Sequence, residues 1–178
     1  MERTTVNARN YIRRGKIENE AAGYLELGMA QQALSALSRL GDPSALDANG
    51  LYILGESLRS LKRFEEAIEP LRLAAETATN NIQVLLALGW CYKRIGRLDL
   101  AINTLEQALA VEPGEPLLRY NLACYFSLAG NKNRALRYLS QTLSAAPDYR
   151  RLIDDEPDFN PIRQDPDFQS LCRKANEG

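Results

Sequence analysis

Apolar residues recur along this chain at the spacing of an α-helix. Between residues 82 and 115, Leu85, Leu88 and Tyr92 lie three or four positions apart, and a second apolar stripe runs over residues 98–109. Apolar positions at this interval lie on one face of a helix. Gly96 separates the two stripes, so the pattern predicts two helices joined by a tight turn.

This pattern repeats every 34 residues through four copies. Three columns carry the repeat, and each holds only small or apolar side chains: Ala21, Gly55, Gly89 and Ala123; Ala33, Ala67, Ala101 and Ala135; Leu37, Leu71, Leu105 and Leu139. A repeat of this length is typical of helical solenoids. We therefore expect four helix hairpins, over residues 14–47, 48–81, 82–115 and 116–149.

Several single residues refine the expected hairpins. Helices approach closely only where a side chain is small, so Gly55 and Gly89 predict narrow contacts inside their hairpins. Asp47 and Asn81 fit the N-cap position before the second and third units. Lys62 stands at the turn position where the other three units have glycine, so the second turn is less clearly marked.

The two ends of the chain fall outside the repeat. Residues 1–13 are expected to extend the first helix, with Tyr11 and Ile12 on its inner side. Residues 150–178 contain two acid-Pro-Asp-Phe motifs, and the second predicts a short helix with Asp165 as its N-cap. A solenoid needs terminal elements over its last apolar face, so we expect a C-terminal cap that packs through five side chains: Leu152, Phe159, Ile162, Phe168 and Leu171.

The third unit resembles the tetratricopeptide repeat (TPR) family. The residues that carry the match are Leu88, Gly89, Tyr92, Gly96, Ala101, Ile102, Ala108, Leu109 and Pro113. Through the other units the resemblance covers about 136 of 178 residues. It implies an all-α fold, a right-handed α-α superhelical solenoid of about four TPR helix-turn-helix units plus capping helices. The tail is similar to a segment that often closes bacterial TPR proteins.

The resemblance also implies a ligand-binding groove, because the first helices of successive TPR units line a concave surface. Mapped onto this sequence, the expected peptide-binding side chains are Tyr52, Glu56, Arg59, Leu86, Trp90, Lys93, Arg94, Tyr120 and Cys124. Two interpretations of Trp90 stay open: a binding anchor for a ligand, or a wedge between neighbouring first helices. The basic members of the set favour an acidic ligand with an apolar anchor. The residues with which some TPR domains clamp chaperone carboxylates are not matched here.

The amino-acid composition argues against several kinds of catalytic and metal-binding site. The chain has no histidine and a net charge of −1, which removes the commonest general base and metal ligand and gives no global reason to expect a nucleic acid. No phosphate-binding loop, dinucleotide fingerprint or nucleophile elbow is present. The acidic residues at 154–158 lack the ligand spacing of a calcium loop. We therefore expect no enzyme activity, no cofactor and no metal.

The cysteines and the apolar runs indicate in which cellular compartment the protein is expected. Cys91, Cys124 and Cys172 lie far apart without a CxxC motif, which favours free thiols in the cytoplasm. The longest apolar runs are far shorter than the roughly 20 residues that span a bilayer.

Together these observations predict a non-enzymatic protein–protein interaction module or assembly scaffold that binds a peptide or protein segment in its concave groove. The alternative is a bacterial secretion-type TPR chaperone that holds client segments. An RNA-binding helical repeat is disfavoured by the 34-residue step and the slight negative charge. The sequence leaves self-association open.

Overall fold

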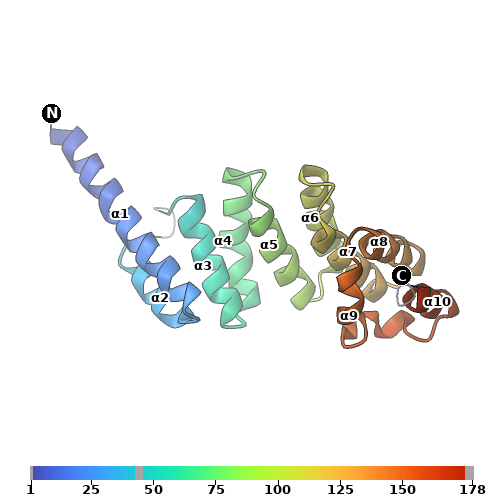
Figure 1. The fold of residues 1–178 in the computed structure, drawn as a ribbon. Helices are drawn as coiled ribbons and strands as arrows, with labels where there is room; N and C mark the ends of the chain where they lie inside the picture. Colours follow the sequence, from blue (N-terminus) through green and yellow to red (C-terminus); the bar gives the residue numbers. More distant parts are fainter. Residues whose placement is uncertain (1, 43–45, 175–178) are drawn as a thin grey trace. The chain divides into compact units, whose positions relative to one another are not determined.

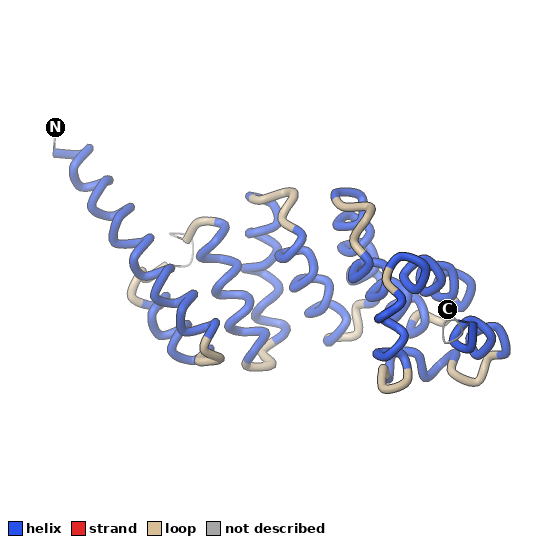
Figure 2. Tube along the Cα trace, in the orientation of Figure 1, coloured by secondary structure: helices blue, strands red, loops and turns tan. Residues whose placement is uncertain are grey.

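The computed structural model describes residues 2–42 and 46–174, and all regular secondary structure in those residues is helical (Figure 2). The first eight helices are α1 (Glu2–Glu26), α2 (Ala30–Ser38), α3 (Ala48–Ser60), α4 (Phe64–Thr77), α5 (Ile82–Arg94), α6 (Leu98–Val111), α7 (Pro116–Leu128) and α8 (Lys132–Ala145). The expected all-α fold of paired helices is confirmed. In the described residues no helix combines the length and the hydrophobicity needed to cross a lipid bilayer.

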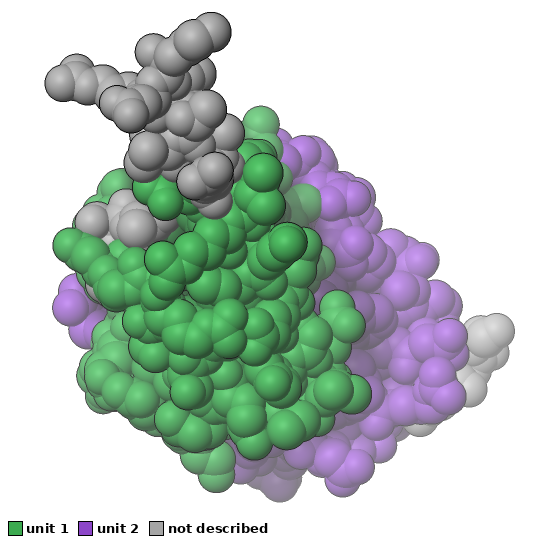
Figure 3. Space-filling model, turned by 90° about the vertical axis from the view of Figure 1, so that its left-hand side faces the viewer, with its two compact units in different colours: residues 1–95 green, residues 96–178 purple. Residues whose placement is uncertain are grey.

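The chain divides into two compact units, residues 1–95 and 96–178 (Figure 3). The first unit contains α1 to α5, and the second contains α6 and everything after it. The boundary falls between α5 and α6, inside the third expected repeat. The helix pairs α1–α2 and α3–α4 therefore belong to the first unit, and α7–α8 belongs to the second.

The small-residue columns lie inside the helix pairs of both units. All four alanines of the second column have no exposed surface: Ala33, Ala67, Ala101 and Ala135. Gly55 lies in the α3–α4 contact, where an added Cβ would be 2.7 Å from Leu71 Cδ2 and closer still to its Cγ. Leu71 itself is fully buried. The expectation of a narrow contact at Gly55 is confirmed.

Side chains at the helix starts satisfy backbone N–H groups, as expected from the sequence. Asp47 accepts hydrogen bonds from the N–H groups of Asn49 and Gly50, at 3.0 and 3.1 Å. Asn81 plays the same part at α5, where it accepts from Gln83 at 3.0 Å. Such caps replace partners that the first turn of a helix lacks. Residues 48 and 82 are thereby fixed as the beginnings of α3 and α5.

The α3–α4 turn uses a lysine where the equivalent turns use glycine. Lys62 has φ 61°, the only left-handed non-glycine backbone among the described residues, and Gly96 in the α5–α6 turn has φ 78°. A residue with a Cβ adopts this conformation at a cost of roughly 1–2 kcal/mol. The packing of α3 against α4 must therefore compensate for the missing glycine.

The N-terminal half of α1 extends past α2 (Figure 1). The expectation that Tyr11 and Ile12 face inward is wrong, because these side chains are 69% and 57% exposed. The physical reason is length: α1 has 25 residues and α2 only nine, so α2 covers only the later part of its partner. Among the α1 side chains that the structure describes, residues 10–26, the first buried one is Ile17.

Four short elements follow α8 in the second unit: η2 (Pro147–Tyr149), α9 (Arg150–Ile153), η3 (Pro157–Ile162) and α10 (Pro166–Lys174). Phe159, Ile162 and Phe168 are buried, as expected for a cap. The Asp167 N–H donates to Asp165 Oδ1 at 2.9 Å, which confirms the predicted N-cap role of Asp165 at the beginning of α10. The expectation for Leu152 is wrong: it is largely exposed, and Ile153 is buried in its place.

The carboxylate of Glu18 in α1 is buried where α1 meets the start of α3. Its Oε1 atom has no hydrogen-bond partner within residues 2–42 and 46–174, and a Cβ on Gly50 would collide with that atom. Burial raises the pKa of Glu18 above its ordinary value of 4.5, and the neighbouring Asp47 carboxylate raises it further, whereas Arg14 lowers it. The charged form of this side chain is therefore less favourable in the folded chain than in the unfolded chain.

Stability is expected to fall as the pH rises through the pKa of Glu18. The group ionises at a higher pH in the folded chain than in the unfolded chain, so protonation stabilises the fold and ionisation destabilises it. Glu18→Gln carries no charge at any pH, and it should therefore be more stable than the wild type near neutral pH. Thermal unfolding of both proteins from about pH 4.5 to pH 7 measures the difference. A variant whose melting temperature changes with pH as the wild type's does would contradict the prediction.

Candidate peptide-binding surface

Three side chains of the first unit gather around the Trp90 indole. The Phe64 ring meets it edge-on, with ring centroids 5.2 Å apart and an interplanar angle of 77°. The guanidinium carbons of Arg59 and Arg94 lie 5.1 and 5.4 Å from the centroid of the Trp90 ring. We call these four residues, Arg59, Phe64, Trp90 and Arg94, the Trp90 cluster. Arginines at this distance from an indole make cation–π interactions.

Three helices supply the cluster. Arg59 lies in the last turn of α3, and Phe64 begins α4 directly after the α3–α4 turn. Trp90 and Arg94 are four positions apart in α5, so they are neighbours on one helix face. Trp90 also packs against the buried core that α3, α4 and α5 share. Packing on this core thus holds the Trp90 indole in place.

The two arginines of the cluster differ in their partners. Arg59 makes a bidentate ion pair with Glu56, with Nε–Oε1 and Nη2–Oε2 distances of 2.6 and 2.7 Å. Those hydrogen bonds raise the pKa of Arg59 above its ordinary value. Arg94 is exposed, and its guanidinium lies over the Trp90 and Phe64 rings, the latter at 5.1 Å. Within the described part of the chain, no carboxylate pairs with it.

The other predicted residues of the first unit lie on α3 and α5, two of the three helices that supply the cluster. Tyr52 is half-buried on α3, and desolvation raises the pKa of its hydroxyl, with Glu56 raising it further. Leu86 and Lys93 are half-buried on α5. All seven predicted residues of this unit thus lie on α3 and α5: Tyr52, Glu56, Arg59, Leu86, Trp90, Lys93 and Arg94.

Tyr120 and Cys124 belong to the second unit, where both side chains are covered. They are only 5% and 2% exposed. The Tyr120 ring contacts Tyr149 and Phe159 of the C-terminal segment, at centroid distances of 5.2 and 5.8 Å. The expectation that both side chains are presented to a ligand is therefore not met. Their position in the repeat places them on the correct helix face, but the cap occupies that face.

Phe64 is a member of the cluster that sequence reasoning missed. It belongs to the second helix of its hairpin, whereas the groove mapping considers first helices alone. Its one signal is a bulky aromatic residue directly after a turn, and that signal identifies no partner. The contact with Trp90 becomes visible only in three dimensions.

An apolar pocket of about 460 Å³ lies apart from the predicted residues, between α2, α3 and α4 of the first unit. Leucines from these helices form much of its wall, among them Leu34, Leu51, Leu54 and Leu73. It exists because α2 has nine residues and α4 has 14, so α2 covers less of α3.

Two family models described as tetratricopeptide repeat match the chain, over residues 19–82 and 58–119. Together they span more than half of its residues. A curated relative, the TPR repeat-containing protein YpiA of Bacillus subtilis (strain 168), is 25% identical over 167 residues. The match covers 78% of this chain and 39% of the relative, so the chain spans less than half of that protein's length.

Solved structures show the same fold at low identity. A MamA structure matches with a TM-score of 0.75 and 20% identity, covering 93% of this chain and 96% of that one. The crystal structure of YrrB, described as a TPR protein with an unusual peptide-binding site, matches with a TM-score of 0.69 and 22% identity, covering 76% and 70%. With the family models, this likeness identifies the helix pairs as TPR units. The chain belongs to the tetratricopeptide repeat family.

Proposed function

We propose that this chain is a non-enzymatic protein–protein interaction module and that the α3–α5 face of its first unit binds an acidic peptide segment with an apolar anchor. The observation that carries the proposal is the state of Arg94. Its guanidinium rests on two aromatic rings and has no carboxylate partner among the described residues. This cation is positioned but not neutralised.

The chemistry of the Trp90 cluster suits an acidic ligand. A guanidinium offers five N–H donors and can hold a carboxylate through two of them. Contact with Phe64 and Trp90 restricts the Arg94 side chain before a ligand arrives, which lowers the entropy lost on binding. The half-buried Trp90 ring supplies apolar contact beside that charge. Tryptophan and arginine are the residues most enriched at binding hot spots.

Glu56 limits what the surface accepts. By pairing with Arg59 it neutralises one of the two guanidiniums on Trp90. The ligand's carboxylate is therefore expected at Arg94 and its apolar residue at Trp90. Membership of the TPR family, and a fold shared with a peptide-binding TPR protein, support interaction rather than catalysis as the function.

A random peptide library selected on the immobilised full chain tests this function. We expect the selected peptides to combine Asp or Glu with an aromatic or large aliphatic residue. Arg94→Glu should weaken the binding of a selected peptide about 30-fold or more, the equivalent of roughly 2 kcal/mol. Arg94→Lys keeps the charge but not the bidentate geometry, so its affinity for the peptide should lie between those of the wild type and Arg94→Glu.

Lys16→Glu is the matched control for Arg94→Glu. It makes the same change in net charge at an exposed position of α1, outside the Trp90 cluster. Its affinity should stay within about threefold of the wild type, because exposed charges away from the contact are screened by salt. Selected peptides without acidic residues, or equal affinity losses for Arg94→Glu and Lys16→Glu, would refute the proposal.

A further inference from the structure

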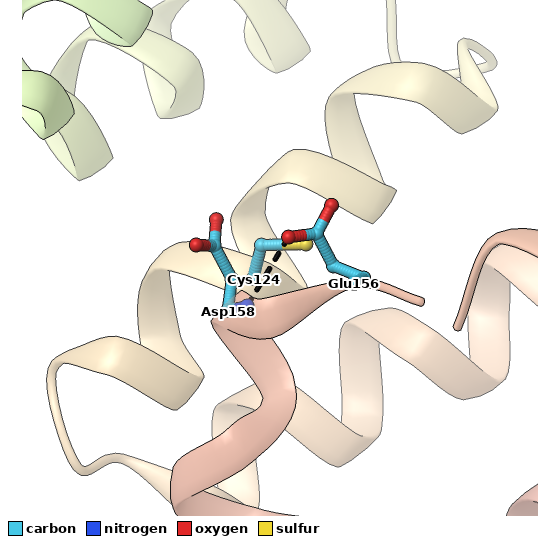
Figure 4. Close-up of side chains that lie close together, drawn as sticks. All are labelled: Cys124, Glu156 and Asp158. Atoms are coloured by element: carbon cyan, nitrogen blue, oxygen red, sulfur yellow. Dashed lines mark hydrogen bonds between the residues drawn. The ribbon is translucent and has the colours of Figure 1, made fainter. Parts of the chain in front are cut away.

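Three side chains that could bind a metal converge in the second unit (Figure 4). Cys124 comes from α7, and Glu156 and Asp158 come from the start of η3. The Cys124 sulfur and one carboxylate oxygen of each acidic residue all lie within 4.8 Å of one another. Cys124 and Asp158 are buried, and Glu156 is half-buried.

The cap holds the two carboxylates in this place. Glu156 Oε1 accepts the Asp158 N–H at 3.1 Å, which fixes both residues at the beginning of η3 (Figure 4). The next residue, Phe159, is fully buried and contacts the Tyr120 ring of α7. The packing of Phe159 on α7 therefore holds the two carboxylates close to Cys124.

A buried hydroxyl provides independent evidence for a ligand at this point. Tyr120 lies one turn before Cys124 on the same face of α7. Its hydroxyl is shielded from solvent and has no hydrogen-bond partner among the described residues. Burial raises the pKa of Tyr120, and the neighbouring Cys124, Glu156, Asp158 and Tyr149 each raise it further. Buried polar groups are rarely left without a partner.

Charge also favours a cation here. Two carboxylates at close range repel each other once both are ionised, unless a positive charge lies between them. Among the described residues the Glu156 carboxylate makes no ion pair with a lysine or arginine and accepts the Asp158 N–H, while Arg163 Nη2 donates to the Glu156 backbone carbonyl at 2.6 Å. A divalent ion would neutralise both carboxylates. The thiol favours zinc over magnesium or calcium, which prefer oxygen ligands alone.

We propose that Cys124, Glu156 and Asp158 bind a zinc-type divalent cation, with a water molecule as the fourth ligand and the Tyr120 hydroxyl hydrogen-bonded to that water. On binding, the Cys124 thiol loses its proton to solvent, and the sulfur–metal bond replaces the sulfur–hydrogen bond. Three protein ligands and one water are a common zinc arrangement. The ion joins η3 to α7 and thereby fixes the cap on the last helix pair.

This inference departs from the expectation that the acidic run binds no metal. Along the sequence, residues 154–158 lack the spacing of a cation loop, and Cys124 lies far from them. Of the four acidic residues in that run, only Glu156 and Asp158 join the cluster; Asp154 and Asp155 are exposed and do not. The third ligand comes from another helix, so only the fold reveals it.

Titration of the reduced full chain with Co²⁺ tests the site. Cobalt replaces zinc in such sites and, unlike zinc, reports a thiolate ligand through a near-ultraviolet charge-transfer band. We expect this band to saturate at one ion per chain and to disappear when Zn²⁺ is added. Cys124→Ala should abolish it, and the matched variant Cys172→Ala should retain it, because Cys172 is likewise a buried cysteine outside any disulfide but lies outside the cluster.

Glu156→Gln keeps the test decisive if Cys124→Ala fails to fold. The amide oxygen can still accept the Asp158 N–H, so helicity should be unchanged, while the loss of a carboxylate ligand should weaken Co²⁺ binding at least about tenfold. Zn²⁺ should raise the melting temperature of the wild type more than that of Glu156→Gln. A chain with no cobalt–thiolate band, or a Glu156→Gln variant that binds as the wild type does, would overturn the proposal.

Discussion

Phe159→Ala is expected to lower the free energy of unfolding by about 3–5 kcal/mol, the usual cost of removing a fully buried phenylalanine. No part of Phe159 is exposed, and its ring lies 5.8 Å from the Tyr120 ring and 5.5 Å from the Phe168 ring. Alanine would lose these contacts and leave a cavity between the cap and α7. Urea unfolding followed by far-ultraviolet circular dichroism measures the change, because it reports the helices of both units.

Leu152→Ala provides the control for the cap. It removes an apolar side chain from the same segment, but this side chain is largely exposed. Exposed substitutions usually change stability by less than about 0.5 kcal/mol, so the midpoint should barely move. Equal midpoints for Phe159→Ala and Leu152→Ala would mean that the C-terminal segment does not pack on α7.

Gly55→Ala is expected to destabilise the first unit by about 1–3 kcal/mol, because it inserts a methyl group into a filled contact. That methyl would lie 2.7 Å from Leu71 Cδ2, and Leu71 has no exposed surface into which it could move. The effect opposes the helix propensity of alanine, which exceeds that of glycine by about 1 kcal/mol. Urea unfolding followed by Trp90 fluorescence reports this unit alone, because Trp90 is the one tryptophan of the chain.

Gly23→Ala is the matched control, with the opposite expected sign. Gly23 lies inside α1, and an added Cβ would meet nothing within 4 Å. The helix propensity of alanine then acts without a clash, so stability should rise by up to about 1 kcal/mol. If both variants shifted stability in the same direction, the α3–α4 contact would not be as narrow as Leu71 indicates.

The repeat made the fold predictable because each of its positions has one dominant physical cause. Ala67 and Ala101 are small because helices cross there, and Asp47 precedes α3 because its carboxylate satisfies backbone N–H groups. These causes act within one hairpin or between adjacent helices. A period of 34 residues repeats them, so one unit that matches well supports the assignment of the others.

The predictions that failed depend on the cap, which lies outside the repeat, or on where a helix begins or ends. Tyr120 and Cys124 occupy groove positions of their unit, but the cap covers them. Tyr11 lies on a helix whose partner is too short to reach it, and the length of α2 is not visible in the apolar pattern. In the short helix α9, Ile153 is buried and Leu152 is exposed, the reverse of what the expected cap requires of Leu152. In each case a neighbour far away in the sequence, or the exact end of an element, decides the outcome.

The contacts of Trp90 bear on both of its interpretations. Its contacts with Phe64 of α4 and Arg59 of α3 are those of a wedge between helices. Its half-buried state and its contact with Arg94 are what an anchor requires. A rigid indole with one accessible part suits both tasks, because packing on one side holds the other side ready. We therefore expect Trp90→Ala to reduce both stability and affinity, and Arg94→Glu to reduce affinity alone.

The indole N–H resonance of Trp90 gives the most direct view of the proposed surface. Because the chain has one tryptophan, a ¹H–¹⁵N spectrum contains one such signal, which needs no further assignment. We predict that adding an acidic peptide selected on the wild type moves this resonance until the surface is saturated, and that the signal of Arg94→Glu stays in place at the same peptide concentrations. A peptide that binds the wild type by calorimetry while the Trp90 resonance does not move would contradict binding at this surface.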